Sequence, residues 1–268
     1  MFGTIRSGMA TSMFEISVVS NNIANAGTTA FRKSGASFSD LYSGASVEAV
    51  SRLYKGGGSI VAGTKQSTEQ GGLLTREGVL NLALIGKGMF VSSATDPALG
   101  PTGRTYTRDG AFLLDKNGVL RTSTNDFVLG YTATGDKTLR KLEVPVLSPT
   151  ESGAQLTALE IDAQGQLLGT YGTEGTILLG QIAIGAFPNE TALRQMGMNR
   201  FQETGDSGKV ALGIGGQDGF AMIRAGVLET SNVDLTTELT NMIRAQQQFS
   251  GSSRILQTYS DMIEKLTR

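Results

Sequence analysis

Apolar side chains recur at steps of three and four residues at both ends of the chain, which is the spacing of one face of an α-helix. The N-terminal row consists of Phe2, Ile5, Met9, Ser12, Ile16, Val19 and Ile23. The C-terminal row repeats at every seventh residue through Leu235, Met242, Phe249, Leu256 and Ile263, and its intervening turns carry Leu239, Ala245, Ser252, Tyr259 and Leu266. Heptad spacing is typical of helices that pack against another helix. The pattern predicts that both ends of the chain are helical and pair with each other.

End signals give the predicted bounds of these two helices. The first runs from about Phe2 to Asn25 and stops at Gly27, which suits the left-handed conformation of a helix cap. The last begins after Asn232, with Asp234 near its start, and runs almost to the end of the chain. At roughly 35 residues it is too long to cover the core of one small domain. Much of its apolar row is expected to contact the N-terminal helix or another molecule.

The middle of the chain has the pattern of β-strands separated by turns. Residues 28–72 show weak periodicity and are rich in Ser, Gly and Thr, which predicts an extended connector. Strand-like runs follow at 78–85, 89–93, 106–108, 111–115, 119–122, 127–132, 158–162, 166–171 and 176–187, with a short helical turn at 190–196. The pattern Asp-x-x-Gly-x-Leu begins at Asp115 and again at Asp162, and predicts a hairpin turn at each.

These elements define an α+β fold in which mainly antiparallel strands lie between two long terminal helices. Residues 1–27 together with 231–268 are predicted to form a helical core domain, 28–72 the connector, and 73–230 a β-rich domain. The chain has 36 Gly residues against 5 Pro, which agrees with many tight turns.

Composition removes several classes of function. The 268 residues include no Cys, His or Trp, which excludes thiol nucleophiles, imidazole bases and the usual zinc ligands, and we expect neither a metal nor a cofactor. The 23 basic and 24 acidic side chains give a formal net charge of -1, so no nucleic-acid partner is expected. No stretch of 18 apolar residues is present, which predicts no membrane insertion, and the first residues do not form a cleaved signal peptide.

Two sets of residues are candidates for chemistry. Gly86-Lys87-Gly88 resembles a phosphate-binding loop, but no Ser or Thr follows the lysine. An acid pair of glycan-hydrolase type, which is one alternative function, would come from Asp109, Asp115, Glu160 and Asp162. Acids beside Gly or Asn are more often turn formers, so we expect no enzyme. A second alternative is an adhesin whose β-region binds a ligand on a helical stalk.

The apolar rows also have two interpretations, because an amphipathic helix more often covers its own domain than a partner. Assembly is favoured here because both termini carry a row, the rows include small residues, and the opposite faces are not densely charged. Those opposite faces carry further apolar residues, namely Ala10, Met13, Phe14, Ile243, Ile255 and Met262. A two-helix pair in water cannot bury all of them, so we predict that neighbouring copies cover them.

Several motifs resemble those of bacterial flagellar axial proteins of the rod and hook family. Residues 20–32, SNNIANAGTTAFR, are similar to the family's N-N-x-A-N-x-x-T-x-G-[FY]-[KR] signature, with Ala30 in place of Gly. Residues 228–234, LETSNVD, and the helix after them are similar to its C-terminal motif. Residues 82–90, 106–112, 129–131 and 187–208 resemble its central β-domain, so the resemblance covers nearly the whole chain.

This resemblance implies a structural subunit of the bacterial flagellar hook or basal-body rod. The terminal helices would pair as a coiled-coil-like inner layer of a tubular helical polymer that transmits motor torque, with the β-domain as the outer layer. Implied partners are further copies of the chain, neighbouring axial proteins, hook-cap or junction proteins, and the flagellar type III export apparatus. The residues at 36–42 and 162–180 resemble those of hook proteins, whereas the length fits rod proteins. We interpret the chain as a short hook-type protein, with a distal or proximal rod protein as the alternative.

The resemblance and the apolar rows together predict the residues of the assembly interface. They are Phe2, Ile5, Met9, Ile16, Val19, Asn22, Ile23, Asn25, Leu235, Leu239, Met242, Phe249, Leu256, Tyr259, Ile263 and Leu266.

Overall fold

The computed structural model describes residues 2–42, 56–95, 103–132, 138–148, 154–172 and 175–267. The chain divides into two compact units. The helical unit comprises residues 1–27, 32–67 and 233–268, and the β-rich unit comprises residues 28–31 and 68–232. Helix and mostly antiparallel strand are both present, which confirms the mixed α and β character predicted from the sequence. No helix in the described part of the chain is long and apolar enough to cross a membrane.

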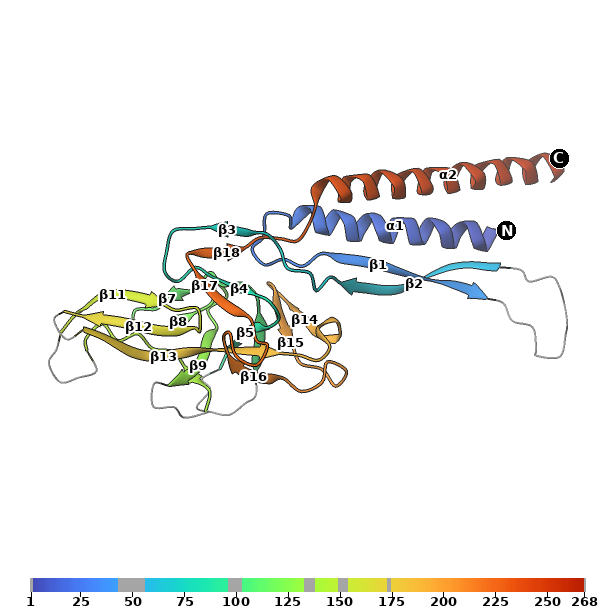
Figure 1. Cartoon of the computed structure of the whole chain (residues 1–268). Coiled ribbons are helices and arrows are strands. Elements are labelled where there is room, and N and C mark those ends of the chain that lie inside the picture. Colours follow the sequence, from blue (N-terminus) through green and yellow to red (C-terminus); the bar gives the residue numbers. More distant parts are fainter. Residues whose placement is uncertain are drawn as a thin grey trace. The chain divides into compact units, whose positions relative to one another are not determined.

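The helical unit contains two helices and one β-hairpin, which lie side by side in Figure 1. Its elements are α1 (Phe2–Ala24), β1 (Ser34–Tyr42), β2 (Gly56–Gln66) and α2 (Leu235–Thr267). The strands β1 and β2 are antiparallel, and Ser34 lies opposite Gln66. The hairpin falls within residues 28–72, for which the sequence predicted an extended connector. Strands of nine and 11 residues there show that this segment is more regular than its composition indicated.

The helix α2 begins at Leu235, two residues beyond the start predicted directly after Asn232, because Asp234 caps it. The Asp234 carboxylate accepts hydrogen bonds from the Thr237 hydroxyl at 2.7 Å and from the Thr236 amide at 3.0 Å. These bonds, the Thr237 bond first, hold the pKa of Asp234 below its usual value. A lowered folded-state pKa means that the cap stabilises α2 above the ordinary pKa of Asp and is lost as pH falls through the lowered value.

The β-rich unit consists of short antiparallel strands. They are β3 (Leu73–Thr75), β4 (Leu82–Ile85), β5 (Met89–Ser93), β6 (Arg104–Thr107), β7 (Leu113–Leu114), β8 (Leu120–Arg121), β9 (Phe127–Thr132), β10 (Arg140–Lys141), β11 (Leu156–Ile161), β12 (Gln166–Tyr171), β13 (Gly175–Ala186), β14 (Arg194–Gly197), β15 (Arg200–Gln202), β16 (Ala211–Ile214), β17 (Met222–Ala225) and β18 (Val227–Glu229). The largest sheet has the order β11-β12-β13-β9-β5-β6-β15-β14, and the pairs β17–β4 and β18–β3 lie outside it. The helical turn predicted at 190–196 is only the 3₁₀ helix η2 (Glu190–Ala192), because β14 follows it.

Two apolar clusters form the core of the β-rich unit on opposite faces of its central strands. In β5, Phe90 belongs to one cluster, whereas Met89 and Val91 belong to the other. This is the alternation expected of a strand covered on both faces, and all five residues of β5 are buried. Edge-to-face aromatic contacts fix each side: Phe90 with Phe112 at 5.0 Å between ring centroids, and Tyr106 with Phe187 at 4.7 Å. Burial, more than nearby Glu203, raises the pKa of Tyr106 to about 12.

The two Asp-x-x-Gly-x-Leu patterns form hairpin turns, as predicted. In the first, Gly118 has a φ of 74° and donates to the Asp115 carbonyl at 2.8 Å; in the second, Gly165 has a φ of 78° and donates to the Asp162 carbonyl at 2.8 Å. Each Asp carboxylate also accepts from the next amide, at 2.7 Å for Asp115 and 2.6 Å for Asp162. Turn formation therefore accounts for both acids.

Ala30 occupies the position where the N-terminal motif has Gly, and it has the left-handed backbone that Gly favours. Its φ is 54°, its side chain is buried, and its amide donates to the Glu229 carbonyl at 2.9 Å. A left-handed conformation costs a residue with a Cβ about 1–2 kcal/mol, partly offset by the lower chain entropy of unfolded Ala relative to Gly.

We expect Ala30→Gly to raise the free energy of unfolding of the β-rich unit by up to about 1 kcal/mol, because it relieves this backbone strain. Ala30→Val is expected to lower it by about 2 kcal/mol, since a β-branched residue tolerates positive φ poorly. Urea unfolding of the two variants and the wild type measures both changes. A clear loss of stability in Ala30→Gly would contradict the strain.

Candidate assembly surface

The helices α1 and α2 pack against each other, as the sequence predicted. Small or short side chains lie at the centre of the contact: Ala245 is fully buried, and Ser12 and Val19 are nearly so. A Cβ placed on Gly8 would lie 3.9 Å from the Ser252 hydroxyl oxygen, so the backbones approach closely there. The heptad residue Phe249 is half-buried. Several members of both rows are therefore buried or half-buried in the helical unit, but Gly8 and Asn22, the α1 residues that lie against Ser252 and Glu238 of α2, are outside the N-terminal apolar row.

One polar node joins α1, α2 and β1 inside the helical unit. The Asn22 amide nitrogen donates to the Ser34 carbonyl at 2.8 Å and to the Glu238 carboxylate at 3.0 Å. Its amide oxygen accepts from the Ser34 N–H at 3.0 Å. Asn22 and Glu238 are 1% and 6% exposed, so these bonds replace those that water would make. The node fixes which turn of α1 faces which turn of α2.

The contact between Asn22 and Glu238 shows that the predicted C-terminal row is wrong at its start. The sequence placed Leu239 in the turn between Leu235 and Met242, but Leu239 is 49% exposed and Glu238 faces α1 instead. The prediction rested on apolar side chains, so it did not include an acid at a heptad position. The amide of Asn22 is what makes a buried acid acceptable there.

The helices are antiparallel, and α2 extends beyond α1. Asn22 lies against Glu238 and Gly8 against Ser252, and in both pairs the residue numbers add to 260. By this register Phe2, the first described residue of α1, faces the turn before Tyr259. The last residues of α2, Tyr259–Thr267, therefore continue past the start of α1. We call these nine residues the overhang.

The predicted assembly residues fall into three groups by exposure. Buried in the helical unit are Val19 and Asn22. Partly buried are Ile5, Met9, Ile16, Ile23, Asn25, Met242, Phe249, Leu256 and Tyr259. Exposed are Phe2, Leu235, Leu239, Ile263 and Leu266. The first two groups serve mainly the contact within the chain, so the last group and its neighbours are the candidates for contact with other molecules.

Exposed apolar residues of α2 form two flanks on different sides of the helix. The first flank consists of Leu235, Leu239 and Ile243, which are 48%, 49% and 56% exposed. The second consists of Ile255, Met262 and Leu266, which are 58%, 55% and 80% exposed. At 3.6 residues per turn the centres of the two flanks are roughly 160° apart around the helix axis. One helix thus offers apolar surface on two sides besides the side that faces α1.

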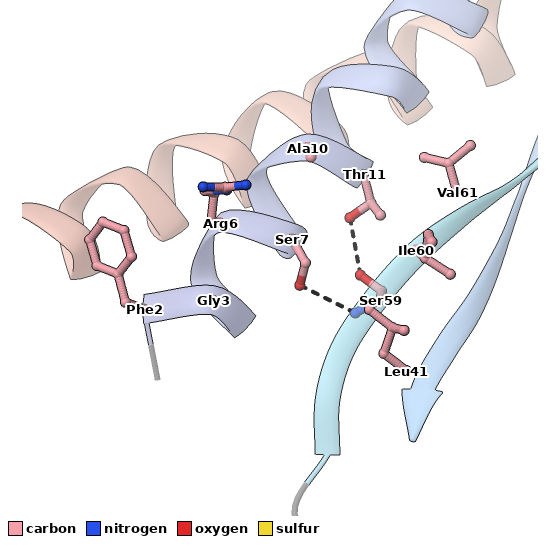
Figure 2. Close-up of a pocket in the computed structure, with 10 residues that line it drawn as sticks. All are labelled: Phe2, Gly3, Arg6, Ser7, Ala10, Thr11, Leu41, Ser59, Ile60 and Val61. Atoms are coloured by element: carbon pink, nitrogen blue, oxygen red, sulfur yellow. Dashed lines mark hydrogen bonds between the residues drawn. The ribbon is translucent and has the colours of Figure 1, made fainter. Parts of the chain in front are cut away.

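A groove lies between the first half of α1 and the end of the hairpin (Figure 2). It has a volume of about 570 Å³, and its apolar lining includes Phe2, Leu41, Ile60 and Val61. Among the described residues that line it, Arg6 is the one with a charged side chain. The hairpin side of this groove lies in residues 28–72, where the sequence predicted an extended connector, so the groove was not expected.

Two hydrogen bonds hold β2 against α1 beside the groove. The Ser59 amide donates to the Ser7 hydroxyl at 3.3 Å, and the Ser59 and Thr11 hydroxyls lie 3.3 Å apart (Figure 2). Gly58 has a φ of 104°, and a Cβ there would collide with the Ser7 hydroxyl. Glycine is therefore required for the strand to approach the helix this closely.

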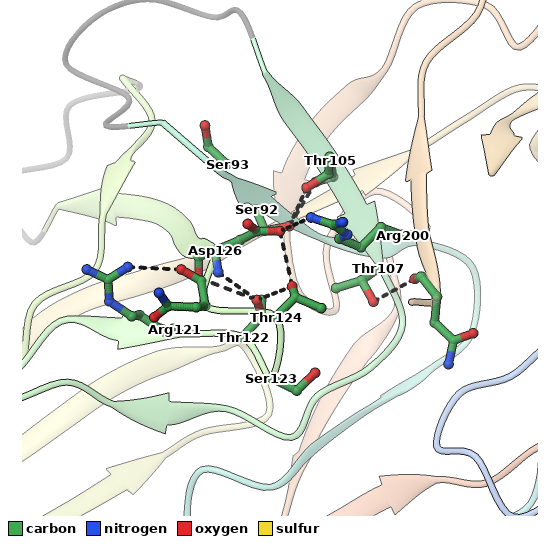
Figure 3. Close-up of polar contacts among 12 residues, drawn as sticks. Ser92, Ser93, Thr105, Thr107, Arg121, Thr122, Ser123, Thr124, Asp126 and Arg200 are labelled. Carbon is green, nitrogen blue, oxygen red and sulfur yellow. Dashed lines mark hydrogen bonds and ion pairs between the residues drawn. The ribbon is translucent and has the colours of Figure 1, made fainter. Parts of the chain in front are cut away.

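Three of the four candidate acids of the β-rich unit, Asp109, Asp115 and Asp162, accept structural hydrogen bonds, and the fourth, Glu160, is exposed on β11. Asp109 accepts from the Ser123 hydroxyl at 2.8 Å and from the Thr29 hydroxyl at 3.2 Å. Asp126, which the sequence did not single out, pairs with Arg200 at 3.0 Å and accepts from Thr124 at 3.1 Å within a cluster of Ser and Thr side chains (Figure 3). Among the described residues, no group of three or more acids could hold a metal ion.

Comparisons with known proteins agree with the resemblance along the whole chain. The family model "Flagellar basal body rod FlgEFG protein C-terminal" matches residues 224–268. The flagellar basal-body rod protein FlgG of Borreliella burgdorferi is 31% identical over 270 residues, covering 97% of this chain and 94% of the relative. FlgG of Caulobacter vibrioides is 32% identical over 273 residues, covering 97% and 95%.

A hook protein matches a shorter part of the chain. The flagellar hook protein FlgE of Escherichia coli K12 is 35% identical over 124 residues, which is 45% of this chain and 31% of that relative. The rod-protein matches extend over almost the full length of both partners, with about one residue in three identical. This chain therefore belongs to the family of flagellar basal-body rod and hook proteins, and it is a structural subunit of the flagellar axis.

Proposed function

We propose that this chain is a rod-type subunit that polymerises into a helical tube and transmits motor torque. The observation that carries the rod assignment is the extent of the matches: rod proteins match 93–96% of their own length in seven comparisons, whereas the hook protein matches 31% of its length. The sequence alone favoured a short hook-type protein with the rod as alternative. A hook protein remains the second candidate because 124 residues resemble one.

The proposed polymer has the helical unit as a coiled-coil-like inner layer and the β-rich unit as its outer layer. The exposed flanks of α2 support this, because apolar side chains at four-residue steps in water are stabilised when another molecule covers them. Contact between two different surfaces of the same chain, without closure into a ring, produces a helical filament. We propose neighbouring axial proteins, hook-cap or junction proteins and the type III export apparatus as its further partners.

Replacing Leu239 and Ile243 with Asp is expected to raise the critical concentration for polymerisation more than tenfold. Burying one such side chain contributes about 1.5–3 kcal/mol, and about 1.4 kcal/mol corresponds to a factor of ten. Both residues are about half exposed in the helical unit, so the circular dichroism of the dilute monomer should not change. Sedimentation of polymer across a concentration series measures the effect.

Gln247→Asp is the matched control, because it adds one acid to an exposed, polar position of the same helix. Polymerisation of this control should resemble that of the wild type. Unchanged polymerisation of the Leu239 and Ile243 variant would remove the first flank from the interface. Antibody labelling of isolated basal bodies decides between rod and hook: label on the rod supports the proposal, and label only on the hook contradicts it.

A further inference from the structure

The overhang of α2 is an apolar helix end with no helix opposite it among the described residues. By the register of the helix pair, α1 begins opposite the turn before Tyr259, so Met262, Ile263 and Leu266 lie past it. Their exposed fractions are 55%, 45% and 80%, which are high for three large apolar residues within five positions. A helix of 33 residues paired with one of 23 leaves such an end whenever the other ends are aligned.

The groove between α1 and the hairpin is a surface of the complementary kind. Apolar side chains from both elements, Phe2 from α1 and Leu41 and Ile60 from the hairpin, line it, and all three are exposed in the helical unit. Its volume of about 570 Å³ is in the range of sites that accept several apolar groups. The hydroxyls of Ser7 and Thr11 already bond to Ser59, so the apolar side chains are the main surface that the groove offers to another molecule.

Charge complements shape in these two surfaces. The charged side chain among the described residues of the groove lining is the cation Arg6. The overhang carries the acids Asp261 and Glu264 against one base, Lys265. An acid of this apolar helix end can therefore pair with the cation that lines the apolar groove.

We propose that the overhang of one copy packs into the groove of a second copy. This inference rests on the proposed self-assembly and names the surfaces that meet. Groove and overhang consist of different residues, so the contact is heterologous: each copy that fills a neighbour's groove leaves its own groove open for the next. The contact therefore propagates along a row of copies. Met262 and Leu266 enter between Phe2 and Ile60, and Asp261 lies near Arg6.

Cysteine cross-linking tests the contact directly, because the chain has no Cys of its own. One sample of Ile60→Cys is mixed with a size-tagged sample of Met262→Cys under conditions in which the wild type polymerises, and the mixture is then oxidised. We expect the mixed dimer to exceed that from Ile60→Cys with Ile243→Cys by about tenfold, since docking raises the effective thiol concentration. All three positions are about half exposed, so the substitutions spare the core.

The outcomes separate this inference from the proposed function. A wild-type chain that stays monomeric at every concentration overturns both. A wild type that polymerises while the mixed dimer does not exceed the Ile243→Cys control overturns the groove contact alone. Arg6→Glu should lower the yield of mixed dimer about threefold to tenfold, and Asp261→Arg in the partner chain should restore it. A yield insensitive to both changes would contradict the predicted placement of Arg6 and Asp261.

Discussion

Replacing Arg108 with Met is expected to lower the free energy of unfolding of the β-rich unit by about 3–5 kcal/mol. The Arg108 guanidinium pairs with the Glu229 carboxylate at 3.1 Å, and the two side chains are 3% and 2% exposed. Its other nitrogens donate to the carbonyls of Gly88, at 2.9 Å, and of Gly86. Removing the cation leaves a buried carboxylate and two carbonyls without these partners.

Glu229 gives this pair a wider role in the β-rich unit. Its second carboxylate oxygen accepts from the Gly71 amide at 3.0 Å, and its carbonyl accepts from Ala30 at 2.9 Å. Arg108 therefore holds three chain segments that are distant in sequence: the stretch at residue 30, the stretch before β3, and β18. Loss of the cation should disorder all three together, which hydrogen exchange at these amides would show.

Two further variants test whether the effect of Arg108→Met comes from the burial of its ion pair. Lys141→Met removes one side of the exposed Lys141–Glu143 pair, and it should cost less than about 1 kcal/mol. The double variant Arg108→Met with Glu229→Leu removes the uncompensated charge, so it should recover part of the loss. Chemical denaturation of the three variants measures these differences. If Arg108→Met lowers the free energy of unfolding no more than Lys141→Met does, the buried ion pair contributes no more to stability than the exposed one.

The sequence predicted best those elements that short-range patterns specify. The heptad rows marked both helices, and the Asp-x-x-Gly-x-Leu turns marked two hairpins. The strands β5, β9 and β12 agree with predicted runs because alternating or continuous apolar residues between turn residues are a local signal. The predicted pairing of the helices needed only that both ends carry such a row.

The elements that were missed depend on contacts that are distant in sequence. The strands β1 and β2 are rich in Gly and Ser, which favour strands weakly, and five glycines lie within the two strands. They are held by α1, through Asn22 at one position and through Ser7 and Thr11 at another. The sequence of the hairpin does not contain this information. The groove was missed for the same reason, since four of its ten lining residues belong to the hairpin.

A second large effect is expected at the polar node, where Asn22→Ala should lower the free energy of unfolding of the helical unit by about 3–5 kcal/mol. The substitution leaves the Ser34 N–H, the Ser34 carbonyl and the Glu238 carboxylate without their partner, and each buried unsatisfied polar group costs about 1–3 kcal/mol. A heptad position that carries a polar pair also sets the register of two helices. Polymerisation should weaken as well, because α2 loses its fixed position on α1.

The position before Asn22 provides the matched control, because Asn21 is exposed and on the same turn of α1. Asn21→Ala should change the free energy of unfolding by less than about 0.5 kcal/mol. A double-mutant cycle with Glu238→Ala isolates the side-chain pair, and we expect a coupling energy of about 1–3 kcal/mol for a buried hydrogen bond to a charged group. Thermal unfolding followed by circular dichroism at the helix band reports on both helices. Equal effects of Asn21→Ala and Asn22→Ala would mean that the polar node does not hold the two helices together. The register that places the overhang beyond α1 would then lack the contact that sets it.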